Sequence, residues 1–506
     1  MSYQSPHNLP SDKVVFSFDK GTLSLENMAL GHIKKIFPSG MWKWDARAGF
    51  WRTDPIHYTN ILKCLMESEL RLSGNSHSYV MEGKSVSNFV IKDGLNDLSY
   101  MEDHVPCWEN VTFSRINLPE LRPEQKEAVE RWWKEKRGVI VMPTGTGKTE
   151  VALYMISRLQ CSTLVVSPVR DLMYQWHRRI LSAFDYDAGV LGDSQNEVRP
   201  ITVTTYDSAA IHMNEMGNQF AFIIFDECHH LPGKFFREAA LMSAAPFRLG
   251  LTATPERSDG KHAELDDLIG PVVYHLSLPR VKGKTLAAYD VVRIPVHLSP
   301  QEQTRYDNLS RKIQGYMIEK RKEKPDYSWE NLLAESGTDA ESRAIQKAFY
   351  LKQAIEDRAE EKFRVLEDIF RLHFGSRIIV FTGTNAAARA VSLRFLIPCL
   401  LSHCKKEERS EILSGFAKGK YPAIAANRVL DEGVDVPEAK VAVVLGGWGS
   451  TRQAVQRLGR ILRKTGNERA VLYEVICEAT REEIVSRKRR RSEAYARVKR
   501  KFQPMD

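Results

Sequence analysis

The 506-residue sequence lacks several features that define whole classes of protein. It has no run approaching the roughly 18 consecutive apolar residues of a membrane-spanning helix, so we expect no membrane partner. Its polar beginning, MSYQSPHNLPSDK, contains no signal-peptide core. Its seven cysteines are scattered and include no C-x-x-C pair, which predicts free thiols in a reducing compartment. These absences together favour a cytoplasmic protein.

Strong net charge is also absent from most of the chain. The segment 487–501 holds nine Lys or Arg residues and one Glu, so it supplies nearly all of the net charge of +9. A basic tail on a nearly neutral body predicts a polyanionic partner. Two other interpretations of this segment remain open, namely a solvated or disordered tail and a nuclear-localisation signal.

Short apolar runs alternate with amphipathic segments over most of the chain. Runs such as GVIVM and FAFIIFDE are continuous, which is typical of strands buried on both faces of a parallel sheet. The pattern stops at 301–362, a long charged segment with helical composition, and resumes with RIIVFTG. We therefore predict an α/β fold with two tandem parallel-sheet domains and a helical insertion. The predicted ranges are a disordered start at 1–13, a small α+β domain at 14–111, α/β domains at 112–278 and 279–480, and a basic tail at 481–506.

A glycine-rich loop, PTGTGKT, lies between an expected strand and an expected helix. It lacks the first glycine of the usual phosphate-binding pattern G-x-x-x-x-G-K-[ST], because residue 142 is Met. Lys148 is expected to reach the β- and γ-phosphates of a nucleotide, and Thr149 to bind Mg²⁺. The helix N-terminus and the backbone N–H groups of the loop favour a phosphate. The loop residues expected to contact the nucleotide are Thr144, Gly145, Thr146 and Gly147.

An acidic pair follows the buried run FIIF. Asp226 at the end of this strand is expected to hold Mg²⁺, and Glu227 to act as general base toward the attacking water. The adjacent Cys228, His229 and His230 suggest zinc as an alternative. Three consecutive residues cannot easily converge on one ion, and the sequence has no second cluster with zinc spacing, so we prefer the nucleotide interpretation.

The segment QAVQRLGRILRK carries a third candidate cluster. On a helix, Gln456, Arg460 and Arg463 lie on one face. Two guanidinium groups one turn apart predict an arginine-finger arrangement that acts on a γ-phosphate. The alternative, arginines on a solvated helix face, is disfavoured because the phosphate loop and the acidic pair are also present.

These motifs occur in an order that resembles superfamily 2 helicases and translocases, whose phosphate loop typically lacks the first glycine. The resemblance spans about residues 115–480 and implies two RecA-like domains. Within the superfamily, the sequence is most similar to the XPB group, especially its archaeal-type members. DECHHLPGKFFREAALMSAAPFRLGLTATPERSDG and MWKWDARAGFWRTDPIHYTNIL carry that similarity. The second of these segments resembles the group's damage-recognition-like N-terminal domain.

The resemblance implies roles that spacing alone does not assign. Arg122 and Gln125 of LRPEQ would read the adenine ring. Gly433 and Asp435 of NRVLDEGVDVP, together with Gln456, would contribute to the nucleotide site. The implied nucleic-acid contacts are Pro168, Arg170 and Gln175 of VVSPVRDLMYQW, Thr204 and Thr205 of VTTYDS, and Arg257 and Asp259.

One loop departs from the resembled pattern. The group typically has Arg-Glu-Asp after LTATP, whereas this sequence has Arg257-Ser258-Asp259. Loss of the carboxylate leaves the flanking arginine with one fewer acidic neighbour. We therefore expect DNA-stimulated ATP hydrolysis but weak unaided unwinding of long duplex. The alternative is that Ser258 is a neutral surface variation.

Four aromatic residues lie close together in the N-terminal segment, at Trp42, Trp44, Phe50 and Trp51. Aromatic side chains in such a segment belong to a core more often than to a nucleic-acid surface. The functional alternative is that at least one is exposed and stacks on distorted DNA.

The resemblance implies an ATP- and Mg²⁺-dependent motor that moves 3′–5′ on DNA and binds both duplex and single strands. It further implies a role in nucleotide excision repair or transcription-linked DNA opening. Archaeal members of the group pair with a repair nuclease, so we expect a similar partner. Such a protein would lie on the nucleoid, or in the nucleus of a eukaryote. The alternatives are an RNA helicase of the same superfamily and a nucleic-acid-binding scaffold that does not hydrolyse ATP.

The arginine-finger hypothesis predicts a specific kinetic pattern. Arg460→Ala and Arg463→Ala should each lower kcat by roughly 10³–10⁵ while changing ATP affinity little, because fingers act on transition-state charge. Steady-state ATPase kinetics measure both effects. A rise in KM at unchanged kcat would show that the arginine binds the ground state.

Overall fold

The computed structural model describes residues 13–67, 71–72, 88–92, 98–256, 259–277, 280, 289–401, 403–427, 439–446 and 470–489. Contacts divide the chain into two compact units, which are described separately below. One consists of residues 1–142 and 147–276, and the other of residues 143–146 and 277–506. Within the described ranges, no helix combines the length and apolarity required to cross a bilayer.

The first unit begins with a small α+β domain built on a seven-stranded sheet of order β3-β4-β2-β1-β7-β6-β5. Its core contains Phe16, Leu25 and Trp42 together with apolar residues of helix α2. The elements are β1 (Lys13–Asp19), β2 (Thr22–Glu26), α1 (Leu30–Ile36), β3 (Lys43–Asp45), β4 (Phe50–Thr53), η1 (Pro55–His57), α2 (Tyr58–Glu67), β5 (Arg71–Leu72), β6 (Asn88–Lys92) and β7 (Leu98–Asp103).

The clustered aromatic residues of this domain divide between core and surface. Trp42 is buried, whereas Trp44 is 53% exposed. The ring centroids of Trp44 and Trp51 lie 5.1 Å apart in an edge-on arrangement, and Trp51 also donates its indole N–H to the Met28 carbonyl. Trp44 is therefore the aromatic residue of this group that is available to stack on a ligand.

The α+β domain shares its apolar contacts with the α/β domain that follows. Ile56 belongs to the core of the α/β domain, and Ala244 belongs to the core of the α+β domain. The Asn218 side-chain amide donates to the Val105 carbonyl over 2.8 Å. A Cβ atom at Gly217 would lie 2.9 Å from the Phe18 ring and 1.9 Å from the Met242 carbonyl oxygen, so the two surfaces meet where only glycine fits.

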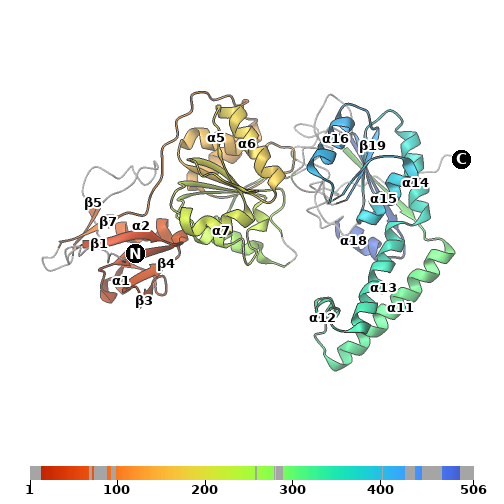
Figure 1. The fold of residues 1–506 in the computed structure, drawn as a ribbon, viewed down its shortest axis with the longest axis horizontal. Coiled ribbons are helices and arrows are strands. Elements are labelled where there is room, and N and C mark those ends of the chain that lie inside the picture. The colour runs from red at the N-terminus through yellow and green to blue at the C-terminus, as the bar shows by residue number, and fades with distance from the viewer. Residues whose placement is uncertain are drawn as a thin grey trace. The chain divides into compact units, whose positions relative to one another are not determined.

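The α/β domain contains an eight-stranded sheet of order β11-β10-β12-β9-β13-β14-β8-β15, in which only the β10–β11 pair is antiparallel. Helices α5 and α6 lie over one face and α7 over the other (Figure 1). The elements are α4 (Pro123–Glu135), β8 (Arg137–Val141), α5 (Lys148–Leu159), β9 (Thr163–Ser167), α6 (Arg170–Phe184), β10 (Gly189–Gly192), β11 (Gln195–Asn196), β12 (Ile201–Thr205), α7 (Tyr206–Met216), β13 (Phe222–Asp226), η2 (Cys228–His230), α8 (Glu238–Leu241), β14 (Phe247–Thr252), η3 (Lys261–Ala263), α9 (Glu264–Leu268) and β15 (Val272–His275).

The second unit contains a wholly parallel sheet of order β16-β21-β20-β17-β19-β18. Its insertion consists of α11 and α13, which run side by side, with α12 near their far end (Figure 1). The elements are β16 (Tyr289–Val296), α11 (Pro300–Glu323), α12 (Trp329–Glu335), α13 (Ala340–Asp357), α14 (Glu360–Leu372), β17 (Ile378–Phe381), α15 (Asn385–Phe395), β18 (Cys399–Leu400), α16 (Lys406–Ala417), β19 (Ala423–Ala426), β20 (Val441–Val444), β21 (Ala470–Cys477) and α18 (Arg481–Arg489).

The predicted fold class is confirmed, and every continuous apolar run that indicated a buried strand forms one. The strands that this rule did not find include β15 and β16, which lie at the edges of their sheets. An edge strand is less completely buried than a central one, and Val272 of β15 is 47% exposed. Its sequence therefore needs no continuous apolar run.

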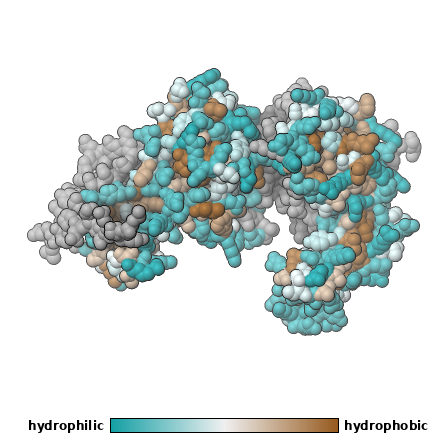
Figure 2. Space-filling model, in the orientation of Figure 1, coloured by the Kyte–Doolittle hydropathy of each residue, from teal (hydrophilic) through white to brown (hydrophobic). Residues whose placement is uncertain are grey.

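The insertion has its own small apolar core and a polar base. Tyr316, Tyr327, Leu332 and Ile345 pack together between its helices, while hydrophilic residues cover most of its lower end in Figure 2. At the base, the Tyr306 hydroxyl donates to the buried Glu356 carboxylate over 2.6 Å.

A second polar group lies next to this base. Lys362 is fully buried, pairs with Glu482 and donates to the Leu445 carbonyl. Burial raises the pKa of Glu356 to about 7 and that of Asp357 to about 6. The carboxyl groups of Glu356 and Asp357, where the insertion meets the sheet domain, are therefore neutral more often than exposed carboxyl groups.

Glu356→Gln should change the pH dependence of stability. Glu356 binds its proton more tightly in the folded protein, so its contribution is fully present below about pH 4.5 and is lost as the pH rises through about 7. Gln stays neutral and still accepts the Tyr306 hydrogen bond. The variant should match the native protein at pH 5 and exceed it at pH 8 by about 1–3 kcal/mol.

Melting curves of the full chain between pH 5 and pH 8 measure this difference. Glu319→Gln, an exposed change in the same insertion, is the control and should leave the pH profile unchanged. If the Glu356→Gln and native curves stay parallel over this range, Glu356 ionises normally in the folded protein.

Candidate active site

The parallel register of five neighbouring strands brings the sequence motifs of the first unit to one edge of its sheet. In the order β12-β9-β13-β14-β8, Thr205 pairs with Ser167, Asp226 with Leu251, and Thr252 with Val141. The carboxyl ends of parallel strands meet at the same edge, where ligands of open α/β sheets bind. Segments as far apart in the sequence as residues 142 and 252 therefore converge on this edge.

The phosphate loop follows β8 and leads directly into α5. Gly147 has φ of +84° and precedes the first residue of the helix. A Cβ atom at this position would lie 2.2 Å from Gln125 Nε2, so glycine is required both for the backbone conformation and for space. Lys148 is largely buried, and its Nζ donates to the Met142 carbonyl over 3.2 Å. Met142, which stands where the usual pattern has glycine, thus supplies a carbonyl that positions the lysine.

The acidic pair follows β13 at the same edge. Glu227 has φ of +46°, which is uncommon for a residue other than glycine and turns the chain sharply after the strand. Its Oε1 lies 4.0 Å from Lys148 Nζ, and its Oε2 lies 3.5 Å from His229 Nδ1. Burial, and secondly the charge of Glu227, raise the pKa of Asp226 to about 6, although the Trp176 indole and Lys148 oppose the shift.

The site meets the requirements of a hydrated Mg²⁺ ion. Carboxylate and hydroxyl oxygens are the ligands that Mg²⁺ prefers, and Asp226 and Thr149 supply them at this edge. Within the described residues, the buried Asp226 carboxylate forms no ion pair. The Oε2 atom of Glu227 is likewise buried, without a hydrogen bond to any described residue. These acceptors are compatible with a bound cation and its water molecules.

Hydrogen bonds join His229, which follows the acidic pair in the sequence, to the segment LTATP. His229 Nδ1 lies 3.1 Å from Thr252 Oγ1, which in turn contacts the backbone of Thr254. If the Thr252 hydroxyl donates to the Thr254 carbonyl, His229 must be the donor in the first bond. The histidine of DECHH is therefore part of this polar chain, and the zinc alternative finds no group of ligands among the described residues.

The residues expected to read adenine lie beside the phosphate loop. Gln125 is buried, accepts a hydrogen bond from the Arg122 backbone over 2.8 Å and donates to the Gly147 carbonyl over 3.3 Å. Arg122 is exposed at the N-terminus of α4. Gln125 thus fixes the loop from the side, and adenine recognition by this pair stays a prediction.

The expected nucleic-acid contacts differ in exposure. Arg170 is exposed at the start of α6, where it pairs with Asp193. Thr204 is fully buried and donates to the Leu191 carbonyl, and Thr205 caps helix α7. Pro168 and Gln175 are partly buried on the same side of the sheet, and Asp259 is exposed. Arg170 is accordingly the most accessible of the candidates at this edge.

Several predicted site residues lie outside the described residues. They are Arg257, Ser258, Gly433, Asp435, Gln456, Arg460 and Arg463, together with the first twelve residues and the tail beyond residue 489. Their predicted roles stay predictions.

Two residues that sequence reasoning did not single out contact the acidic pair. The Trp176 indole donates to Asp226 Oδ2 over 2.8 Å, and the Tyr206 hydroxyl donates to the Asp226 carbonyl over 3.0 Å. Trp176 follows Gln175 in the sequence, but the identification of its partner depends on how α6 packs across the sheet. The sequence offered one indication, because a buried tryptophan usually needs a hydrogen-bond acceptor for its indole N–H.

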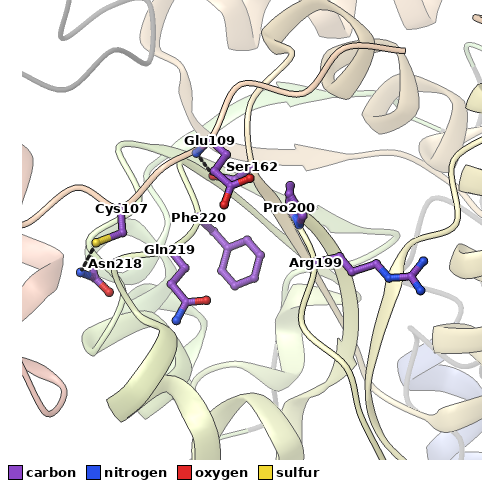
Figure 3. Close-up of a pocket in the computed structure, with 8 residues that line it drawn as sticks. All are labelled: Cys107, Glu109, Ser162, Arg199, Pro200, Asn218, Gln219 and Phe220. Carbon is purple, nitrogen blue, oxygen red and sulfur yellow. Dashed lines mark hydrogen bonds between the residues drawn. The ribbon is translucent and has the colours of Figure 1, made fainter. Parts of the chain in front are cut away.

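A separate hollow of about 240 Å³ lies at the opposite edge of the sheet, before strands β9, β12 and β13 (Figure 3). Ser162, Pro200 and Phe220 line it, and Arg199 at its rim is already paired with Asp187 and Glu197. It contains none of the predicted site residues.

Comparison with known proteins gives consistent matches. Residues 118–257 match the family model "Type III restriction enzyme, res subunit", and residues 345–494 match the ERCC3/RAD25/XPB C-terminal helicase model. The chain is 40% identical over 440 residues, 86% of its length and 99% of the relative's, to the DNA 3′-5′ translocase XPB2 of Sulfurisphaera tokodaii.

More distant similarities extend over much of the same chain. The DNA 3′-5′ helicase XPB of Kineococcus radiotolerans is 27% identical over 385 residues, which cover 73% of this chain and 62% of that protein. The crystal structure of the Pyrococcus furiosus Hef helicase domain is 20% identical, with a TM-score of 0.48, and the match covers 73% of this chain and 98% of that one. On the 40% identity over nearly the whole length of the first relative, the chain belongs to the XPB family.

Proposed function

We propose that this protein is an ATP-driven motor of 3′–5′ polarity that moves along DNA or opens it. The observation that carries the proposal is the placement of Lys148, Asp226 and Glu227 at one edge of a parallel sheet, beside the exposed Arg170. The relatives are named as DNA 3′-5′ translocases or helicases, which supports DNA rather than RNA as the nucleic acid along which the motor moves.

The chemistry assigned to each residue follows from its surroundings. Lys148 places its ammonium group on the β- and γ-phosphates, and backbone N–H groups of the loop bind phosphate oxygens. Glu227 accepts a proton from the attacking water, because its buried Oε2 makes no hydrogen bond within the described residues. His229 Nδ1 lies 3.5 Å from this oxygen, while Lys148 lies nearer the other one.

Asp226 and Thr149 hold the metal. When bound, Mg²⁺ neutralises the charge that develops on the phosphate oxygens. Asp226 presents a carboxylate whose Oδ1 and Oδ2 each accept one N–H, so lone pairs remain for a cation. Arg460 and Arg463 supply the remaining positive charge in this proposal, on the basis of their spacing.

DNA binding is assigned mainly to phosphate contacts. Arg170 and the ends of β9 and β12 present side-chain and backbone donors that do not distinguish bases, so binding should be independent of sequence and weaker at high salt. The exposed Trp44 of the α+β domain adds a surface on which an unstacked base can lie.

The cellular role is proposed from the relatives. Proteins named as subunits of general transcription and DNA repair factor IIH in Arabidopsis thaliana and Schizosaccharomyces pombe are 26% identical to this chain, which spans about half of their length. We assign the protein to nucleotide excision repair or transcription-linked opening, on the nucleoid or in a nucleus, with a repair nuclease as a partner.

ATPase assays test which nucleic acid the motor moves along. They compare hydrolysis without nucleic acid with hydrolysis in the presence of duplex DNA, single-stranded DNA or RNA. DNA should stimulate hydrolysis more than RNA does. Stimulation by RNA alone would favour the RNA-helicase alternative, and binding of DNA without any hydrolysis would favour the scaffold.

Lys148→Ala and Glu227→Gln test the site. The first should abolish hydrolysis by weakening nucleotide binding. The second should retain binding but lower kcat by roughly 10²–10⁴, because an amide cannot accept the water's proton. ATPase rates and nucleotide titrations measure these effects. Lys126→Ala and Glu215→Gln, both exposed in the same unit, are the matched controls. Near-normal turnover in the two site variants would contradict the assignment.

A further inference from the structure

Trp176 is a buried side chain that contacts the site but has no role in the mechanism described above. It lies in α6, is 2% exposed, and donates its indole N–H to Asp226 Oδ2 over 2.8 Å. The other oxygen, Oδ1, accepts the backbone N–H of Glu227 over 3.0 Å. Each carboxylate oxygen of Asp226 is thus held by a different N–H group.

These two bonds determine the orientation of the carboxylate. The terminal torsion of an aspartate is intrinsically broad, so its plane is set by its partners. Donors on both oxygens define that plane, and each oxygen keeps a further lone-pair direction for a ligand. Without the indole, the Glu227 N–H alone would restrain a group that has to face a cation.

The indole itself is held by a rigid element. Met173, Ile180 and Phe184 are buried on α6, which packs against β9 and β12. At the start of the helix, Arg170 and Tyr174 both bind the Asp193 carboxylate. Movement of the Trp176 ring would therefore require movement of the whole helix.

A buried indole N–H needs an acceptor, but that acceptor need not be a carboxylate. Trp132 in the same unit is equally buried and donates to the main-chain carbonyl of Arg248 over 3.0 Å. That bond gives the indole N–H an acceptor that carries no charge. The two tryptophans are therefore similarly buried, and they differ in the acceptor of the indole hydrogen bond, which is a carboxylate for Trp176 and a main-chain carbonyl for Trp132.

We propose that Trp176 is a positioning residue, whose indole N–H orients the Asp226 carboxylate for Mg²⁺ in the nucleotide site. The inference rests on the proposed function and deepens it. Groups that hydrogen-bond to a metal ligand without touching the metal typically contribute 10–100-fold to metal affinity. Trp176 would thus act on the Mg²⁺-dependent part of nucleotide binding without touching the nucleotide.

The test compares Trp176→Phe with Trp132→Phe in the full chain. Each change removes one indole N–H, keeps an aromatic ring and leaves one buried acceptor. Fluorescence anisotropy of a mant-labelled non-hydrolysable ATP analogue, titrated with Mg²⁺, gives the Mg²⁺ concentration at half-saturation. Direct excitation of the label avoids energy transfer from the tryptophans that are replaced.

Trp176→Phe should raise the Mg²⁺ half-saturation by at least about 10-fold, whereas Trp132→Phe should leave it unchanged. Both variants should bind the analogue like the native protein in the presence of EDTA. Equal half-saturation in the two variants, or a native value for Trp176→Phe, would overturn the inference. If the native protein itself shows no Mg²⁺-dependent binding, the proposed function fails instead.

A second measurement does not depend on the folding of Trp176→Phe. In native protein labelled with ¹⁵N at the indole nitrogens, addition of Mg²⁺ to the complex with the analogue should shift the Trp176 signal and not the Trp132 signal. Assignment uses the Trp132→Phe spectrum and single replacements of the other tryptophans. An unmoved Trp176 signal at saturating Mg²⁺ contradicts a bond to a metal-binding carboxylate.

Discussion

Backbone hydrogen bonding between parallel strands determines where the reactive side chains of the first unit can lie. Strands β9, β12, β13 and β14 are buried along their whole length, so their register is fixed by the apolar core on both faces. A slip of one residue would move Asp226 by about 3.3 Å and turn its side chain to the other face. The position of the carboxylate relative to Lys148 is thus maintained by residues such as Ile223 and Phe225, which take no part in chemistry.

Two buried charged side chains of this unit differ in how many of their hydrogen-bond donors or acceptors have partners. Arg248 is 1% exposed and donates to the carbonyls of Ala240, Ser243, Ala245 and Leu268, so backbone oxygens accept from four of its five N–H donors. Burial lowers the pKa of Arg248 well below its usual value. Asp226, by contrast, keeps lone pairs that no described residue uses. A satisfied charge stabilises a fold, whereas one with spare capacity marks a place for a ligand.

The sequence was sufficient to predict the elements that periodicity encodes. Continuous apolar runs predicted the buried strands, and the glycine-rich loop and the acidic pair identified residues that the structure brings close together, since Lys148 Nζ lies 4.0 Å from Glu227. Edge strands were not predicted, because a partly exposed strand does not need a continuous run of apolar residues. The hydrogen bond between Trp176 and Asp226 was not predicted for a different reason. It joins residues fifty positions apart, and it depends on the packing of α6, for which a single sequence provides no measure.

The glycine at position 217 has a consequence for how this architecture can evolve. Its missing side chain lets the Phe18 ring and the Met242 carbonyl both lie close to its backbone, and Ala244 is buried within the core of the α+β domain. A protein that gained this motor unit by domain shuffling, without its N-terminal neighbour, would expose that apolar surface to water and to other chains. Exchange of the neighbour for a different recognition domain would require simultaneous change on α7 and α8. The pair is therefore inherited most easily as one block, and new specificity is more accessible through surface residues such as Trp44 than through replacement of the domain.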